Sequence, residues 1–238
     1  GETLFVVSLE QNLAYSDDQG KTWIKQTGKP NGTFAVIMGV KDRLYASMKI
    51  NTYDFEIYYS LDKGASWTLD TIGLPKSLTA TGKSGMTLRY MRDDYLLAYN
   101  YSTAVYKKLG EQTWKPTKID LVVIDAAATT NKWLAIGQAK ILQSTDHGQN
   151  WTAITTSGLP AGVQGSLICS NGSRIFISNP PANGGQDIYY SDDGGTSWTL
   201  TNSAGKFTHV YPWIQSIYAD EDFFFAGIRP GGIQDPPP

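Results

Sequence analysis

The 238-residue sequence predicts an all-β fold built from about five repeats of four short strands. Three observations predict it. One turn motif recurs along the chain, its copies follow at a nearly regular interval, and the segments between them read as short strands without a helical period. With 41% hydrophobic and 12% aromatic residues, the chain can fill the core of such a fold.

The recurring motif is S-x-D-x-G-x-x-W. Four copies are complete, and a fifth keeps its length and its final Trp114 but has Lys107, Leu109 and Glu111 in place of Ser, Asp and Gly. Successive motif tryptophans are 44, 47, 37 and 47 residues apart, a spacing that suits a four-stranded unit. The complete copies contain Ser16, Asp18, Gly20 and Trp23; Ser60, Asp62, Gly64 and Trp67; Ser144, Asp146, Gly148 and Trp151; and Ser191, Asp193, Gly195 and Trp198.

The second unit shows how each repeat divides into strands. Residues 34–40 form a nearly continuous apolar run, which indicates an innermost strand buried on both faces. We expect a second strand over 43–48, a third over 56–60, and a fourth that starts at Trp67 after the motif turn. Equivalent innermost strands are expected at residues 86–91, 121–128, 165–170 and 213–219. Four strands per repeat favour a β-propeller over a sandwich or a β-helix.

The strands at the two ends of the chain do not balance. A second-type strand over residues 3–8 opens the chain, and an innermost strand followed by a second-type strand over 222–228 closes it. Because one strand is surplus, we expect five blades with a displaced end strand or a piece of a longer propeller, and six complete blades would contradict the count. We expect one domain over 1–228 and a Pro/Gly-rich tail or linker over 229–238.

The motif has a physical role as the hairpin turn between the third and fourth strands. Its Asp can accept hydrogen bonds from backbone N–H groups, its Gly supplies a positive φ, and its Trp packs between adjacent sheets. Calcium binding by Asp17, Asp62, Asp146 and Asp193 is the alternative. Each copy offers one or two carboxylates instead of the dense oxygen set that calcium needs, so we expect no metal and no cofactor.

On these residues the chain resembles the Asp-box family, also called BNR repeats. This family includes sialidases, sortilin-type receptors, xyloglucan-degrading enzymes and photosystem assembly factors. The resemblance covers essentially the whole chain and implies a β-propeller. It does not choose a function, because the boxes of this family lie on turns remote from the active face in catalytic and non-catalytic members alike.

The enzyme alternative is a glycoside hydrolase, sialidase-like or otherwise glycan-cleaving. The resemblance would imply three arginines that hold a substrate carboxylate, and the five arginines of this chain do not reproduce that pattern. Glu56 beside Asp54 is the best pair of carboxylates for glycoside cleavage, and Arg89 is the arginine to test with them. His147 and His209 have no spacing that assembles a metal pair or a catalytic triad.

Charge and cysteine content exclude further classes. The formal net charge is -2 and only 18% of residues are charged, so we expect no nucleic-acid partner. No apolar run reaches the roughly 18 to 20 residues that span a bilayer, so we expect no membrane insertion. The single Cys169 cannot form an internal disulfide, and its apolar strand indicates a core thiol. The oligomeric state stays open.

We therefore expect a non-catalytic binding or scaffold module of a secreted or cell-surface protein, located outside the cell, in a periplasm or on the cell surface. Its ligand is a carbohydrate or a protein. We expect the ligand on the face opposite the motif turns, because the long loops gather there and loops over a rigid frame carry function. The expected ligand-binding residues, which combine aromatic rings with polar groups, are Tyr53, Asp54, His209, Tyr211 and Trp213.

Overall fold

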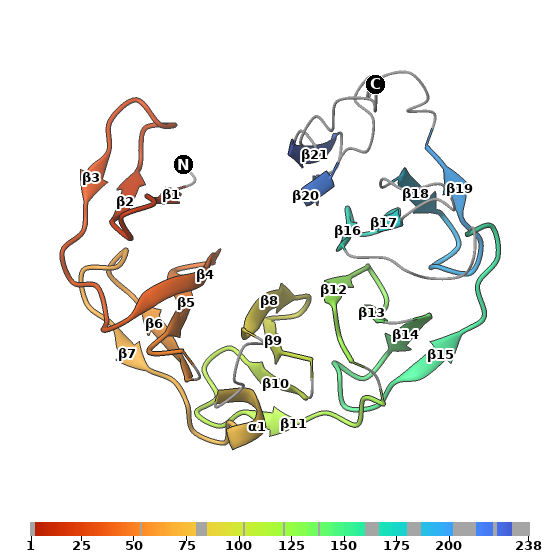
Figure 1. Ribbon diagram of the computed structural model, residues 1–238, viewed down its shortest axis with the longest axis horizontal. Helices are drawn as coiled ribbons and strands as arrows, with labels where there is room; N and C mark the ends of the chain where they lie inside the picture. Colours follow the sequence, from red (N-terminus) through yellow and green to blue (C-terminus); the bar gives the residue numbers. More distant parts are fainter. Residues whose placement is uncertain are drawn as a thin grey trace, which may run out of the picture. The chain divides into compact units, whose positions relative to one another are not determined.

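The chain folds into antiparallel β-sheets that follow one another along the sequence (Figure 1). The computed structural model describes residues 3–52, 54–79, 85–101, 103–120, 122–137, 139–159, 167–179, 187–201, 213–220 and 223–229. Each sheet is made of strands that are consecutive in sequence and pair with their neighbours. The prediction of an all-β fold is confirmed.

Four of the described sheets have four strands each. They comprise β4 (Thr33–Val40), β5 (Arg43–Lys49), β6 (Phe55–Ser60) and β7 (Thr68–Leu69); β8 (Thr87–Met91), β9 (Tyr95–Tyr99), β10 (Ala104–Lys108) and β11 (Lys115–Pro116); β12 (Asp125–Ala128), β13 (Trp133–Gly137), β14 (Lys140–Ser144) and β15 (Thr152–Ile154); β16 (Leu167–Ser170), β17 (Ile175–Asn179), β18 (Asp187–Ser191) and β19 (Thr199–Leu200). In each of them a turn motif separates the third strand from the fourth, as the sequence predicts.

Two further sheets are smaller. The first contains β1 (Leu4–Val7), β2 (Leu13–Ser16) and β3 (Ile24–Lys25), and the last contains β20 (Trp213–Ala219) and β21 (Phe224–Arg229). Together they hold one strand more than a fifth blade needs, which is the imbalance expected from the sequence.

Two expectations about the elements are wrong. The apolar run of β4 is not buried on both faces, because Ala35 and Gly39 are exposed, whereas residues 44–48 of β5 are buried. The reason is that β4 pairs on one side only and β5 lies between β4 and β6. The expected absence of helix also fails locally: α1 (Lys76–Thr79) is one helical turn that brings Leu78 into the core.

The chain divides into two compact units, residues 1–117 and 118–238. In the first unit, buried side chains of β4 to β11 form an apolar core that contains Trp114 and Leu78. In the second unit, one apolar cluster joins strands β12 to β18 with Trp198, and another joins β16 to β18 with β20 and β21. The division into one domain and a tail stays a prediction, because residues 230–238 lie outside the described residues.

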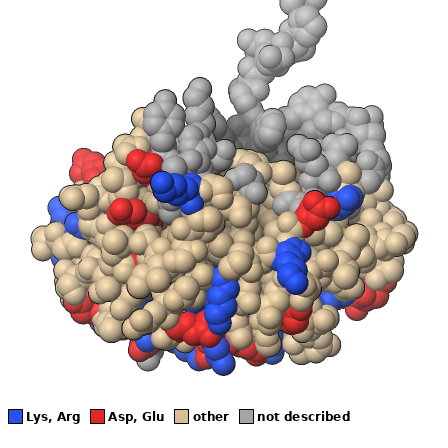
Figure 2. All heavy atoms as spheres, turned by 90° about the horizontal axis from the view of Figure 1, so that it is seen from below, with Lys and Arg blue, Asp and Glu red and all other residues tan. Residues whose placement is uncertain are grey.

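Acidic and basic side chains are interspersed on the face shown in Figure 2, and neither sign gathers into a broad patch there. Within the described part of the chain, no helix has the length and apolar character needed to cross a bilayer.

Candidate functional site

The four complete motif turns share one set of hydrogen bonds. The Ser hydroxyl donates to the Asp carboxylate over 2.7–2.8 Å and accepts the Gly N–H over 2.7–2.9 Å. The N–H of the residue before Trp donates to the same carboxylate, and the Trp Nε1 donates to the Gly carbonyl. The turn thus satisfies its own polar groups.

One further position of this motif takes part, which the pattern S-x-D-x-G-x-x-W leaves open. The residue before the Trp is Thr22, Ser66, Asn150 or Ser197, and its side chain donates to the second Asp oxygen over 2.5–2.7 Å. This restriction to small polar residues is visible in the printed sequence. Because both carboxylate oxygens already accept hydrogen bonds, the box Asp works as the acceptor at the centre of the turn.

The hydrogen bonds also set the charge state of the turn. A hydrogen bond from the Ser66 side chain, followed by one from the Ser66 amide, lowers the pKa of Asp62 to about 2. The equivalent bonds from Thr22 lower the pKa of Asp18 to about 2. These carboxylates are therefore ionised at neutral pH, because hydrogen bonding to a carboxylate favours its charged form.

A pocket of about 500 Å³ opens beside the last complete motif, in the second unit. Such a volume is within the range of ligand pockets. Its apolar lining consists of Phe176 on β17 with Phe223 and Phe224 at the start of β21. Its polar lining consists of Asn171, Ser173, Arg174, Asp192, Thr201 and Asp220.

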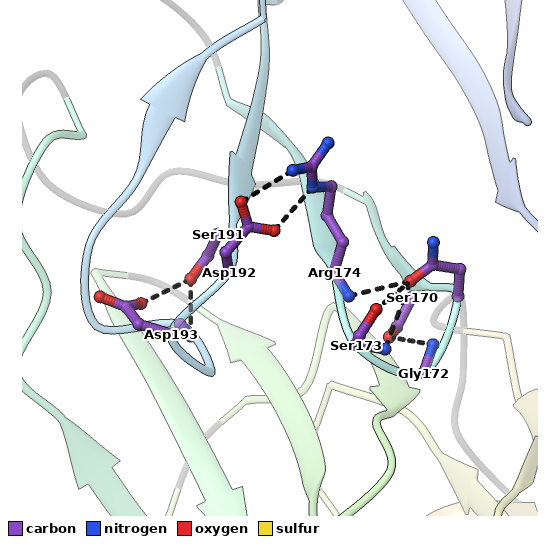
Figure 3. A network of polar contacts seen from close by, with 9 residues as sticks. Ser170, Gly172, Ser173, Arg174, Ser191, Asp192 and Asp193 are labelled. Atoms are coloured by element: carbon purple, nitrogen blue, oxygen red, sulfur yellow. Dashed lines mark hydrogen bonds and ion pairs between the residues drawn. The ribbon is translucent and has the colours of Figure 1, made fainter. Parts of the chain in front are cut away.

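Arg174 and Asp192 form a two-pronged ion pair at this pocket (Figure 3). Arg174 Nε lies 2.6 Å from Asp192 Oδ1, and Nη2 lies 2.8 Å from Oδ2. The guanidinium also covers the ring of Tyr190, 4.5 Å from its centroid. These contacts orient the half-exposed Arg174 side chain, and the hydrogen bonds from Arg174 lower the pKa of Asp192.

The turns around the ion pair are fixed by their own side chains. Asn171 Oδ1 accepts hydrogen bonds from the N–H groups of Ser173 and Arg174. Asp220 Oδ1 accepts the N–H of Phe223 over 2.7 Å. The pocket thus combines aromatic and polar lining residues.

Two of the aromatic residues that line the pocket stack on each other. Phe176 and Phe224 lie 4.4 Å apart between centroids, with 27° between their planes. They belong to two different sheets, so the stack joins β17 to β21. An aromatic surface of this kind binds apolar parts of a ligand.

The carboxylates expected for glycoside cleavage are engaged locally. Asp54 Oδ2 accepts a hydrogen bond from Asn51, and Glu56 Oε2 accepts one from the Tyr58 hydroxyl over 2.5 Å. Asp54 and Glu56 lie at the start of β6, while Arg89 lies in the middle of β8 in the next sheet. Their catalytic role stays a prediction.

Three of the expected ligand-binding residues, Tyr53, His209 and Tyr211, lie outside the described residues. Trp213 begins β20, and Asp54 precedes β6. The prediction of a ligand face opposite the motif turns therefore stays a prediction. The pocket includes Asp192 of a motif turn, and the sequence pattern did not single out Arg174.

Comparison with known proteins agrees with the repeats. The BNR/Asp-box repeat family matches residues 14–23 and 189–200, which hold the first and last complete motifs. A search of the curated proteins finds no match by sequence. The chain thus carries Asp-box repeats, as the sequence resemblance predicts.

Solved structures show the fold. YCF48 from Cyanidioschyzon merolae aligns over 97% of this chain and 78% of its own, with a TM-score of 0.71 and 13% identity. YCF48 bound to D1 peptide aligns over 95% and 72%, with a TM-score of 0.62 and 18% identity.

Two larger proteins align over part of their length. An ancestral GH74 enzyme aligns over 89% of this chain and 31% of its own, with a TM-score of 0.62 and 13% identity. PorZ of the Porphyromonas gingivalis type-IX secretion system aligns over 84% and 26%, with a TM-score of 0.57 and 16% identity. The predicted fold is confirmed: the chain is an all-β propeller of about five blades.

Proposed function

We propose that this Asp-box propeller chain is a non-catalytic binding module that holds a segment of a partner protein. The observation that carries the proposal is the pocket beside Arg174, whose lining combines a two-pronged ion pair with a pair of stacked rings. Peptide-binding sites combine apolar pockets with a few oriented polar groups in this way.

Two similar structures support a binding role. YCF48, which shares the fold, is described as bound to D1 peptide, and PorZ is described as an essential bacterial surface component. On the same basis we place this chain outside the cytoplasm, in an extracellular, periplasmic or cell-surface setting. A carbohydrate ligand is the alternative, since aromatic rings beside polar groups also suit sugars.

The experiment uses a random dodecapeptide library displayed on phage and selected on the wild-type chain. Enriched peptides are then titrated against the wild type and against Arg174→Ala. We expect binding to weaken by about tenfold or more in Arg174→Ala, because the variant removes the fixed guanidinium at the pocket.

Arg43→Ala is the matched control. Arg43 begins the second strand of its sheet, just as Arg174 stands at the start of β17. Arg43 covers the ring of Tyr59 at 5.7 Å, but Arg43 does not line the pocket. Equal losses in both variants, or none in Arg174→Ala, would contradict the proposal. If the chain binds to a glycan array and the library yields no enriched peptide, the ligand is a carbohydrate and not a protein segment.

A further inference from the structure

The sequence contains three asparagine–glycine pairs, at residues 31–32, 171–172 and 183–184. The third pair lies outside the described residues. Such a pair permits the chain to react with itself, because the backbone nitrogen of the glycine can attack the side-chain carbonyl carbon of the asparagine. Glycine obstructs this attack least, since it has no side chain. The two described pairs have the same chemistry, so the surroundings of each decide how fast it reacts.

The first pair is free to react. Asn31 is exposed and lies between β3 and β4. Within the described part of the chain, the Asn31 side chain makes no hydrogen bond, and the Gly32 N–H makes none either. The side chain can therefore turn toward the Gly32 nitrogen, and this nitrogen can lose its proton without first breaking a hydrogen bond.

The turn around the first pair requires its glycine. Gly32 has a φ of +100°, and an added Cβ would lie 2.4 Å from the Lys49 carbonyl oxygen of β5. The Gly32 carbonyl also accepts a hydrogen bond from Lys29 Nζ. A bulkier residue, which would slow the attack, cannot take this place. The fold thus keeps the most reactive neighbour beside Asn31.

Hydrogen bonds hold both reacting groups of the second pair. Asn171 Oδ1 accepts the Arg174 N–H over 2.9 Å, and it accepts the N–H and the hydroxyl of Ser173 over 3.3 Å each. The Gly172 N–H donates to Ser170 Oγ over 2.9 Å (Figure 3). Attack by Gly172 on the Asn171 side chain therefore requires that several hydrogen bonds break first.

We infer that Asn31 is a site of spontaneous deamidation in the folded protein, and that the fold protects Asn171 from the same reaction. Hydroxide removes the proton of the Gly32 N–H, and the nitrogen then attacks Cγ of Asn31. As this bond forms and closes a cyclic succinimide, the bond from Cγ to Nδ2 breaks and ammonia leaves. Water opens the ring at one of its two carbonyl groups, which yields aspartate or isoaspartate.

The reaction changes the turn before β4 and leaves the pocket as it is. Either product replaces a neutral amide by a carboxylate near Lys29, and isoaspartate also adds a methylene group to the main chain. The change lies next to the first residue pair of the β4–β5 ladder, Thr33 with Lys49. Because Asn171 lines the pocket, its protection preserves the lining. The inference does not depend on the proposed function.

The purified wild-type chain is incubated at mildly alkaline pH, below its melting temperature, and sampled over several weeks. Peptide mass spectrometry measures deamidation at each asparagine, and electron-transfer fragmentation separates isoaspartate from aspartate. We expect Asn31 to react about tenfold faster than Asn171 or more, because each hydrogen bond that must break lowers the population of the reactive conformation. Equal rates in the folded chain, or a faster reaction at Asn171, would overturn the inference.

The same chain unfolded in urea is the control for the local sequence. There both pairs should react at similar rates, because the hydrogen bonds around Asn171 are gone. A difference that persists in urea would assign it to the flanking residues and overturn the role of the fold.

Two variants test the sites themselves. Ser170→Ala frees the Gly172 N–H, so it should speed the reaction at Asn171 and leave the rate at Asn31 unchanged. Asn31→Gln should remove the fast reaction, because a longer side chain does not close the same ring. An unchanged rate at Asn171 in folded Ser170→Ala would contradict the protection. If this variant does not fold, the comparison of folded and unfolded wild type decides.

Discussion

At the residue scale, the motif serine illustrates how one small side chain organises a turn. Ser60 is 2% exposed, and its hydroxyl joins the Asp62 carboxylate to the Gly64 N–H. Gly64 has a φ of +91°, and an added Cβ would lie 2.3 Å from Leu13 of the preceding sheet. Glycine is therefore required for the backbone conformation, and a side chain at this position would also displace Leu13.

The motif tryptophans differ in burial, and this difference predicts stability. Trp198 is 4% exposed and Trp23 is 45% exposed, although both make the same hydrogen bond to the motif Gly. We expect Trp198→Ala to cost about 3–5 kcal/mol in free energy of unfolding, and Trp23→Ala much less, because the lost core volume decides the cost. Urea unfolding of both variants measures it. Similar losses of free energy of unfolding in the two variants would show that the shared hydrogen bond, and not the buried volume, decides the cost.

The motif aspartates predict a dependence of stability on acid. The pKa of Asp62 is about 2 in the folded chain, against about 4 in an unfolded chain. Because the folded pKa is the lower one, its stabilisation is fully present above about pH 4 and is lost as the pH falls toward 2. The free energy of unfolding should fall less steeply over this range in Asp62→Asn than in the wild type. Parallel curves would refute the assignment.

At the element scale, the segment that follows the last strand of one sheet forms backbone hydrogen bonds with the motif of the next sheet. The backbone N–H of Trp114 donates to the Ile72 carbonyl, and the backbone N–H of Trp198 donates to the Ser157 carbonyl. Ser157 also forms a parallel bridge with Ser197, and Lys118 forms one with Asn150. Gly158 is required in this arrangement, because an added Cβ would lie 2.1 Å from the Trp198 carbonyl oxygen. The connecting segments thus hold adjacent sheets in register.

The degenerate motif replaces turn chemistry with a buried ion pair. Lys107 stands at the Ser position, and its ammonium bonds to Asp70 with side-chain exposures of 3% and 5%. It also lies 5.0 Å from the centre of the Trp114 ring, and Trp114 Nε1 donates to the Asp70 carbonyl. Asp70 follows β7 of the preceding sheet, so this cluster joins two sheets within the first unit.

This cluster predicts a strong coupling. Lys107→Met leaves the Asp70 carboxylate buried without its partner, and we expect a loss of about 3–5 kcal/mol in free energy of unfolding. Adding Asp70→Asn should restore part of that loss, because the unpaired charge disappears. A double-mutant cycle in urea measures the coupling, and additive effects of the two changes would contradict it.

At the scale of the whole molecule, repetition determines the fold, and departures from it mark the site. Arg43 and Arg174 each stand at the start of a second strand, and each covers the ring of a tyrosine. Of the two, Arg174 forms an ion pair with a motif carboxylate, Asp192. The motif beside Arg43 has Leu61 at the position of Asp192. The pocket lies at this departure, between the sheet of β16 to β19 and the sheet of β20 and β21. A repeat supplies the frame, and local substitutions within it supply chemistry.

The choice between binding module and glycoside hydrolase is tested on the intact chain. We expect no turnover in a screen of fluorogenic glycosides, because the lining of the pocket beside Arg174 includes none of the three candidates Asp54, Glu56 and Arg89. Turnover that is lost in Glu56→Gln but kept in Asp192→Asn would establish the hydrolase instead.

The sequence by itself determined the fold class, the repeat and most strands, because these follow from local patterns. Turn residues, apolar alternation and the spacing of the tryptophans all act within one unit. It also indicated that Lys107 departs from the motif, but not that Asp70 compensates for it. Only the tertiary structure decided which strands are buried and where the pocket lies. Burial of β5 depends on partners on both sides, and Arg174, Phe176, Asp192 and Phe224 meet only because separate sheets pack together.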